Sequence, residues 1–195
     1  IDVNAAIAGG GNAATRLNVA FNATGAVNLN AGANLSTKIG NVTINSATLS
    51  QIAGTTVSGT SLTVNNSGAG TMAGTIGGTT NLIKNGAGTL TLSGANAYTG
   101  VTTINAGTLA LDATGTIAAS SGVANAGTFT IAAAKTIDSM TGTGATALGA
   151  NTLTIGDASN TSSTYTGVAS GTGGITTAGT GTLTLGGANL YTGAT

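Results

Sequence analysis

Few residues in this chain could take part in acid–base, metal or nucleophilic chemistry. Among its 195 residues there is no His and no Cys. Its charged residues are Asp2, Arg16, Lys38, Lys84, Asp112, Lys135, Asp138 and Asp157. A Ser–His–Asp or Cys–His arrangement therefore cannot form, and zinc would lack its usual ligands. We expect no catalytic residue, no cofactor-binding residue and no metal site, and we do not expect an enzyme.

Asp138 and Asp157 are the one pair of carboxylates that a repeating fold could bring together. They lie 19 residues apart, which is about one coil of a solenoid, and neighbouring carboxylates can serve acid–base catalysis or calcium binding. We favour the simpler interpretation that both are solvated loop residues. The glycine clusters at 9–11, 77–78 and 173–174 are interpreted as chain corners, because no Gly-x4-Gly-Lys-Ser/Thr phosphate-binding motif is present.

Three further features could bind a ligand. Tyr98 and Tyr191 could stack against carbohydrate, although packing across a glycine corner is the interpretation we favour, and Lys84 is expected to be solvated. Outward rows of threonine could resemble those of ice-binding solenoids. These rows would come from the runs Thr89/Thr91, Thr128/Thr130, Thr152/Thr154 and Thr182/Thr184. Their irregular spacing argues against a regular array, and Thr is a common outward residue of strands.

Composition excludes several classes of partner. The chain has 4 basic and 4 acidic residues and a formal net charge of zero. Nucleic acids and anionic membrane surfaces attract clustered Lys and Arg, so neither is an expected partner. No run of about 18 apolar residues occurs that could cross a membrane as a helix. The hydrophobic fraction of 41% separates the chain from disordered Gly- and Ser-rich sequences.

The elements that must position these residues are short strands. Apolar residues alternate with polar ones at period two, which places the apolar pair on one face of a strand. The pairs are Val27/Leu29, Val42/Ile44, Leu62/Val64, Leu90/Leu92, Leu109/Leu111, Phe129/Ile131, Leu153/Ile155 and Leu183/Leu185. They recur roughly every twenty residues, which predicts an all-β fold, a parallel β-solenoid of about nine coils. The alternative is an antiparallel sandwich, which the absence of Pro and the scarcity of aromatic residues disfavour.

One phrase occurs twice. Residues 86–100 read GAGTLTLSGANAYTG and residues 179–193 read GTGTLTLGGANLYTG, with twelve of fifteen positions identical at an offset of 93. A repeated phrase indicates one structural unit used more than once. The residues expected to build this unit are Lys84, Gly86, Gly88, Leu90, Leu92, Gly94, Asn96, Tyr98 and Gly100, and in the second copy Gly179, Gly181, Leu183, Leu185, Gly187, Asn189, Tyr191 and Gly193.

The stretch 81–111 resembles the passenger-associated transport repeat of bacterial autotransporters. The pattern L-x-K-x-G-x-G-T-L-x-L-x-G-x-N-x-Y-x-G-x-T-x-I-x-x-G-x-L-x-L is matched from Leu82 to Leu111. A truncated second copy, 175–195, departs from it at Thr177, where the pattern has Lys. The opening third is similar to filamentous-haemagglutinin-type adhesins in the stretches Ile1-Asp2-Val3 through Leu17-Asn18-Val19, Val27-Asn28-Leu29-Asn30 and Asn41-Val42-Thr43-Ile44-Asn45. The resemblance implies a right-handed parallel β-helix in a passenger domain at the bacterial cell surface or outside the cell.

We expect 1–195 to be a single β-solenoid segment, part of a longer chain, acting as a structural or adhesive stalk of a secreted cell-surface protein. The alternative is a self-assembling extracellular filament or surface-layer subunit joined through open β-helix ends. A third possibility is a passenger whose enzymatic groups lie outside this segment. The expected partners are other segments of the same chain or like subunits at the open ends, with a host or neighbouring-cell surface as a further candidate. No nucleic acid and no membrane insertion of this segment are expected.

Overall fold

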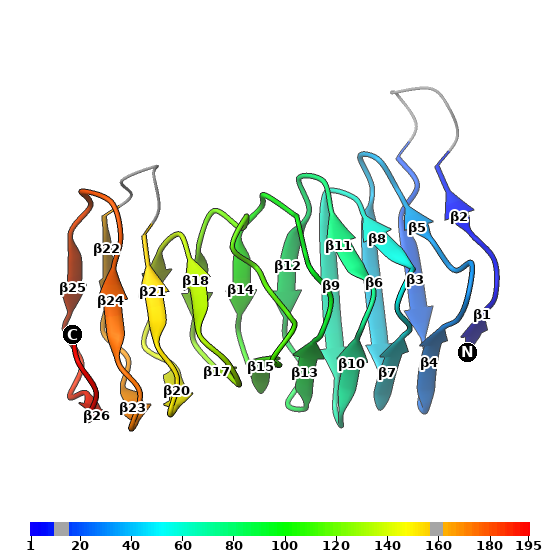
Figure 1. Ribbon diagram of the computed structural model, residues 1–195. Coiled ribbons are helices and arrows are strands. Elements are labelled where there is room, and N and C mark those ends of the chain that lie inside the picture. Colours follow the sequence, from blue (N-terminus) through cyan, green and yellow to red (C-terminus); the bar gives the residue numbers. More distant parts are fainter. Residues whose placement is uncertain (10–15, 157–161) are drawn as a thin grey trace.

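A computed structural model describes residues 1–9, 16–156 and 162–195 of the chain. The described residues form 26 strands and no helix, so no helix among them could cross a membrane (Figure 1). All pairings between named strands are parallel, and each joins strands of successive coils. The predicted β-solenoid is confirmed, and the antiparallel sandwich is excluded.

The strands are distributed over three faces of the rod, and most coils contribute one strand to each face. The first face is one ten-stranded sheet: β1 (Asp2–Val3), β4 (Ala26–Leu29), β7 (Thr48–Gln51), β10 (Gly70–Met72), β13 (Thr89–Leu92), β15 (Thr108–Leu111), β17 (Thr128–Ile131), β20 (Ala145–Gly149), β23 (Ala169–Gly171) and β26 (Leu190–Tyr191). This sheet runs the whole length of the rod, and its strand number agrees closely with the nine coils expected.

The second face begins as a four-stranded sheet: β2 (Ile7–Ala8), β5 (Leu35–Ser36), β8 (Thr56–Ser58) and β11 (Thr75–Gly77). It resumes as a three-stranded sheet: β18 (Lys135–Ile137), β21 (Leu153–Ile155) and β24 (Ile175–Thr177). Figure 1 shows both sheets along the same side of the rod. Between them, the Ala97 N–H donates to the Ile76 carbonyl at 3.0 Å, an ordinary hydrogen-bond length. Ala95 also forms a parallel bridge with Thr116, so the stacking of coils continues there without regular strands.

The third face is a seven-stranded sheet: β3 (Val19–Asn22), β6 (Asn41–Ser46), β9 (Ser61–Asn66), β12 (Asn81–Lys84), β14 (Thr102–Ile104), β16 (Val123–Asn125) and β19 (Met140–Thr141). A bridge between Gly142 and Tyr165 extends it to the pair β22 (Ser163–Tyr165) and β25 (Leu183–Leu185). The chain therefore visits the third, first and second faces in turn, and then begins the next coil.

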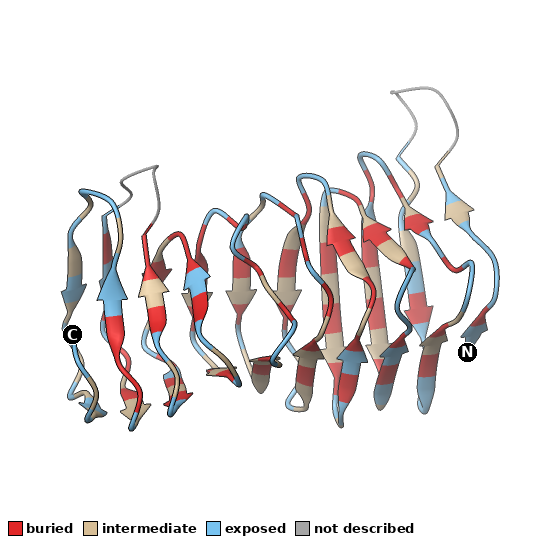
Figure 2. Ribbon diagram, viewed as in Figure 1, coloured by how far each residue is buried: buried red, intermediate tan, exposed pale blue. Residues whose placement is uncertain are grey.

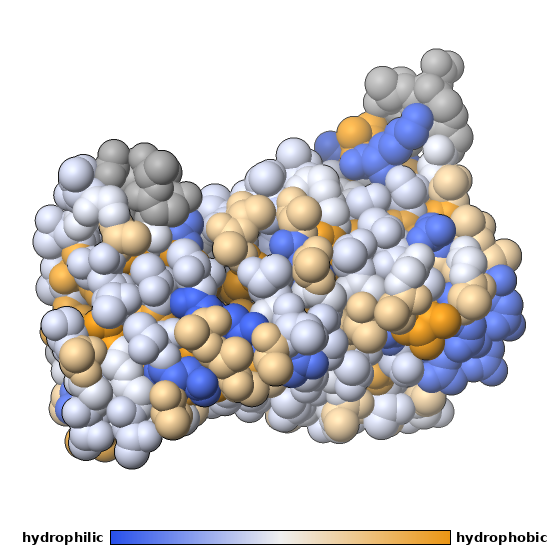
Figure 3. Space-filling model, viewed as in Figure 1, coloured by the Kyte–Doolittle hydropathy of each residue, from blue (hydrophilic) through white to orange (hydrophobic). Residues whose placement is uncertain are grey.

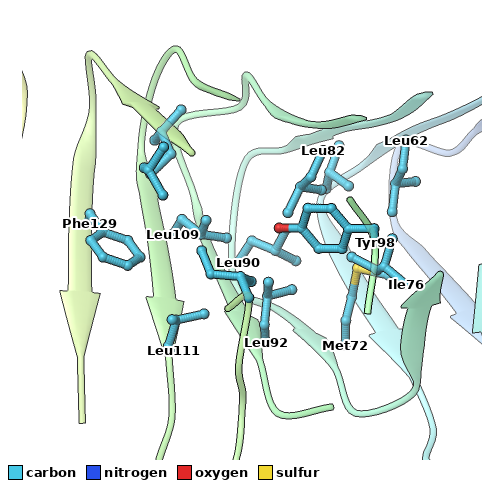
Figure 4. Packing of buried hydrophobic residues seen from close by; sticks show 14 of the residues in the cluster. Leu62, Met72, Ile76, Leu82, Leu90, Leu92, Tyr98, Leu109, Leu111 and Phe129 are labelled. Atoms are coloured by element: carbon cyan, nitrogen blue, oxygen red, sulfur yellow. The ribbon is translucent and has the colours of Figure 1, made fainter. Parts of the chain in front are cut away.

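Alternation explains the core, because side chains of a strand point to opposite sides of its sheet. Figure 2 shows buried residues alternating with exposed or intermediate ones along the strands. Seven of the eight predicted apolar pairs are at most 5% exposed, while Leu183 and Leu185 in the last coil are half-buried. Leucine, isoleucine and a few larger side chains from all three faces fill the interior, as the close view around Tyr98 shows (Figure 4).

The separation between successive apolar pairs does not always equal one coil, because successive pairs can lie on different faces. Val27/Leu29 lies on β4 of the first face, and Val42/Ile44 lies on β6, the third-face strand that begins the next coil. Less than one full coil separates the two pairs, which explains their short separation. Leu153/Ile155 lies on the second face and Leu183/Leu185 on the third. The alternation predicted which residues point inward, and the pairing then showed which face each occupies.

The outer surface of the rod is largely uncharged. On the third face, asparagine amides connect successive coils, with Asn45 donating to Asn22 (2.6 Å) and Asn105 donating to Asn85 (2.7 Å). Figure 3 shows one side of the molecule, where most of the surface has intermediate hydropathy and small hydrophobic and hydrophilic areas are scattered. The polar character of the surface therefore comes from Thr, Ser and Asn rather than from charged residues.

Candidate functional site: the corner of the repeated unit

The two copies of the repeated phrase build the same local structure on different faces. In the first copy β12 lies on the third face and β13 on the first. In the second copy the equivalent strands β24 and β25 lie on the second and third faces. Local sequence, rather than position around the rod, therefore determines this structure.

An asparagine closes the corner in each copy. The Asn96 amide donates to the Gly94 carbonyl (3.0 Å), and its Oδ1 accepts the N–H of Ile76 from the preceding coil (2.8 Å). Asn189 donates to Gly187 (3.1 Å) and accepts the N–H of Ala169 (2.9 Å) in the same way. Each asparagine thus fixes its own turn and binds a backbone donor of the coil below it.

A tyrosine two residues further on points into the rod. The Tyr98 ring is fully buried, and its hydroxyl lies 2.7 Å from Oγ1 of Thr102, which lies 3.0 Å from Oγ of Ser120. In the second copy the Tyr191 hydroxyl lies 2.5 Å from Oγ1 of Thr195. Burial raises the pKa of Tyr98, because the phenolate would be desolvated. A ring in this position cannot serve as the carbohydrate-stacking platform considered for Tyr98.

Glycines allow the coils to approach at these corners. A Cβ on Gly94 would lie 1.9 Å from the Gly74 carbonyl oxygen, and one on Gly187 would lie 1.9 Å from that of Gly167. Both distances are far shorter than a van der Waals contact. The expected glycines at these two positions are therefore required by close backbone approach rather than by a ligand.

Lys84 is buried, so the expectation that it is solvated was wrong. It has no exposed surface, and it lies in register with Val64 and Ile104 on the inward side of β12. Its Nζ donates to the carbonyls of Gly86, in its own coil, and Ala106, in the next coil (3.4 Å). Desolvation lowers its pKa. The long aliphatic stem packs in the core, while the ammonium group is held by backbone carbonyls at the corner.

A second buried lysine is held in a similar way. The Lys135 Nζ donates to the carbonyls of Ala113 (3.0 Å) and Gly115 (2.5 Å) of the preceding coil. Desolvation lowers its pKa, and attraction to Asp112 opposes this. The Asp112 carboxylate accepts the N–H of Gly115 (2.8 Å). Hydrogen bonding, first from Ser93 and then from Gly115 and Thr114, holds the pKa of Asp112 at about 2.

Sequence reasoning missed two asparagines that act like Lys84. Asn66 donates to the carbonyls of Gly68 (2.5 Å) and Thr89 (2.8 Å), and Asn125 donates to that of Ala145 (2.8 Å). Both are buried at the end of a third-face strand. The signal was present as a polar residue two positions before a glycine, in Asn66-x-Gly, Lys84-x-Gly and Asn125-x-Gly. In each case the polar group binds a carbonyl of the following coil.

The other candidate residues are not gathered into a site. Asp138 directly follows β18 and is buried, with 8% of its surface exposed, so the expectation of a solvated loop residue was wrong for it. Asp157 lies outside the described residues. The Thr89/Thr91 and Thr128/Thr130 runs share the first face, whereas Thr154 lies on the second and Thr184 on the third. The four runs therefore do not form one array. Within the described residues the structure holds no pocket and no group of three acidic metal ligands.

A comparison with models of protein families finds a match for the repeated unit. Residues 82–111 and 175–195 match the family model described as passenger-associated transport repeat. Neither the curated proteins nor the solved structures contain a significant match. The similarity of the opening third to filamentous-haemagglutinin-type adhesins lies outside the matched segments and stays a prediction. The chain thus contains two segments that match this repeat, and the β-solenoid around them supports a repeat domain of the autotransporter passenger type.

Proposed function

We propose that this repeat domain of the autotransporter passenger type serves as a rigid structural or adhesive stalk segment of a secreted protein at the bacterial cell surface. The observation that supports it most is the ten-stranded first face, which runs without interruption from β1 to β26. At about 4.8 Å between strands, nine intervals give a rod of about 43 Å. A rod of this kind holds whatever precedes it at a fixed distance from whatever follows it.

Inter-coil bonding at the corners supports the rigidity that a stalk requires. Asn66, Lys84 and Asn125 each bind a carbonyl of the following coil, and Asn96 binds an N–H of the preceding one. In a solenoid each coil contacts mainly its neighbours, so such bonds raise the cooperativity between them. The proposal assigns no reaction to these residues, and it gives the outward, uncharged side chains the role of contacting a host or neighbouring-cell surface.

Removal of whole coils from the full passenger tests the stalk role. Leu62, Leu82 and Thr102 are in register on successive coils, so deletion of residues 62–101 removes two coils and preserves the pairing. We expect an N-terminal tag to remain displayed on cells, with the purified rod about 10 Å shorter by small-angle X-ray scattering. Deletion of residues 62–91, which breaks the pairing, is the control and should abolish display. An unchanged length, or equal display of both deletions, would contradict the proposal.

A second candidate function is an end-to-end filament of like subunits. It is favoured by the parallel stacking of the coils, because strands of like subunits can pair end to end in the same direction as the strands of successive coils. Sizing of the purified chain over a wide concentration range distinguishes this candidate from the stalk. A filament requires assemblies that grow with concentration, whereas a monomer at all concentrations counts against it.

A further inference from the structure

The corner between β12 and β13 contains the only Asn-Gly dipeptide of the chain, Asn85-Gly86 (Figure 1). In such a dipeptide the glycine nitrogen can approach the preceding side-chain amide closely, because glycine has no Cβ to crowd it. Asn85 is exposed to solvent. The second copy of the repeated unit has Ala178-Gly179 at the equivalent positions, so the dipeptide is particular to the first copy.

The glycine nitrogen is not held by a hydrogen bond. Asn85 belongs to an outward row at the end of the third-face strands, which consists of Asn22, Asn45, Asn65, Asn85 and Asn105. At Asn22 the N–H of the following residue, Ala23, donates to the Asn45 carbonyl at 2.9 Å. The N–H of Gly86, in contrast, has no partner among the residues that the structure describes. It can therefore lose its proton without breaking a bond of the fold.

The side-chain amide of Asn85 is polarised by its neighbour in the row. Its Oδ1 accepts a hydrogen bond from Nδ2 of Asn105 at 2.7 Å. This bond draws electron density from the side-chain carbonyl and stabilises negative charge that develops on Oδ1. On the other side, Asn65 Oδ1 is buried without a partner, so Nδ2 of Asn85 makes no bond to it. The amide nitrogen of Asn85 is thus free to leave.

The packing of the corner fixes the second residue of the dipeptide. A Cβ on Gly86 would lie 2.0 Å from the carbonyl oxygen of Asn66 in the preceding coil. The Gly86 carbonyl also accepts a hydrogen bond from Nζ of Lys84. The fold therefore requires glycine after Asn85, although this glycine leaves the asparagine open to attack.

We propose that Asn85 is a site of spontaneous covalent modification, in which the Gly86 nitrogen closes a succinimide ring that water then opens. In the first step the Gly86 nitrogen loses its proton and bonds to Cγ of Asn85, and the bond from Cγ to Nδ2 breaks with release of ammonia. Hydrolysis at Cγ leaves an aspartyl residue in a normal chain. Hydrolysis at the main-chain carbonyl leaves an isoaspartyl residue, whose chain runs through the side chain. Water is the only other reactant.

Either product changes the corner. The isoaspartyl product lengthens the main chain by one carbon directly before Gly86, which displaces Gly86 from Asn66 and from the Lys84 ammonium group. Both products also place a negative charge beside Asn105, on a surface with few charged residues. The modification goes beyond the stalk role, because it requires only the folded corner and water.

The test is prolonged incubation of the 195-residue chain at about 37 °C and about pH 8, followed by peptide mapping with mass spectrometry. We expect a gain of about 1 Da, the difference between a carboxyl and a carboxamide group, at residue 85. The rate should rise about tenfold per pH unit, because the Gly86 nitrogen must lose its proton. Asn85→Ala is the matched control, because alanine occupies this position in the second copy, and it should show no gain there.

A second variant tests the part played by the row. Asn105→Ala keeps the dipeptide but removes the hydrogen bond to Oδ1, so conversion should become at least about threefold slower. Hydrogen exchange should become faster in residues 82–92 of the incubated parent chain, and not in incubated Asn85→Ala. The proposal is overturned if residue 85 gains no mass, if Asn22 converts as fast as Asn85, or if Asn105→Ala converts as fast as the parent.

Discussion

Replacement of Asn96 by alanine is the sharpest test of how the repeated unit holds its coil. The substitution removes the bond from Nδ2 to the Gly94 carbonyl and leaves the N–H of Ile76 without its acceptor. Ile76 is fully buried, so no solvent replaces that acceptor. A lost hydrogen bond costs about 1 kcal/mol, and a buried unpaired donor costs about 1–3 kcal/mol. We therefore expect Asn96→Ala to lower the free energy of unfolding by about 2–4 kcal/mol.

The measurement is urea unfolding followed by circular dichroism, with two further variants for comparison. Asn105→Ala removes an exposed amide pair with Asn85 and should cost less than about 1 kcal/mol. Asn189→Ala removes the same two bonds as Asn96→Ala, but the last coil can open without the rest. Asn189→Ala should therefore lower the free energy of the main unfolding transition by less than Asn96→Ala does. The reasoning is refuted if Asn96→Ala stays within about 0.5 kcal/mol of the parent, or if Asn105→Ala costs as much.

Two further predictions concern the corners of the repeated unit. In urea unfolding, Gly94→Ala should lower the free energy of unfolding by about 3 kcal/mol or prevent folding, because its Cβ would meet the Gly74 carbonyl. Gly25→Ala is the control and should change this free energy by less than about 1 kcal/mol, because no atom lies within 4 Å of its added Cβ. Burial raises the pKa of Tyr98 above its ordinary 10.0, so the folded state keeps a proton that the unfolded state releases, and stability should fall as pH rises above about 10. Tyr98→Phe should show a shallower fall over the same pH range, and an identical slope would contradict this.

The alternation of apolar residues was sufficient to predict the class of fold and nearly all of its core. Leu90 and Leu92 point inward because a strand alternates sides, and this rule requires no knowledge of the neighbouring coils. The face on which a pair lies could not be predicted in the same way. Val27/Leu29 and Val42/Ile44 look alike in sequence, yet the first pair lies on the first face and the second on the third face, because the positions of the corners determine the face.

Lys84 shows why its burial was not predicted from residue type. A lysine is normally solvated, since burial of its charge is costly unless hydrogen bonds compensate. The compensation comes from the carbonyls of Gly86 and Ala106, and Ala106 is 22 residues away in the next coil. Sequence alone does not reveal that a carbonyl of the next coil will stand beside this ammonium group. The sequence pattern that accompanies this buried contact is a polar residue two positions before a glycine.

The offset of the two repeats explains how one phrase can serve on different faces. From β12 the third face is visited again at β14, β16, β19 and β22, and the chain then passes through β23 on the first face to β24 on the second. The repeat at an offset of 93 residues thus begins four coils and two further faces later, in agreement with about twenty residues per coil. Asn96 and Asn189 nevertheless make the same bonds. The repeated unit therefore specifies how a coil turns and closes, and leaves open which side of the rod it occupies. The residues that the two copies of the repeated unit share lie at the corners and in the interior of the rod. We therefore expect residues that contact a partner at outward positions where the copies differ, such as Ala97 and its exposed equivalent Leu190.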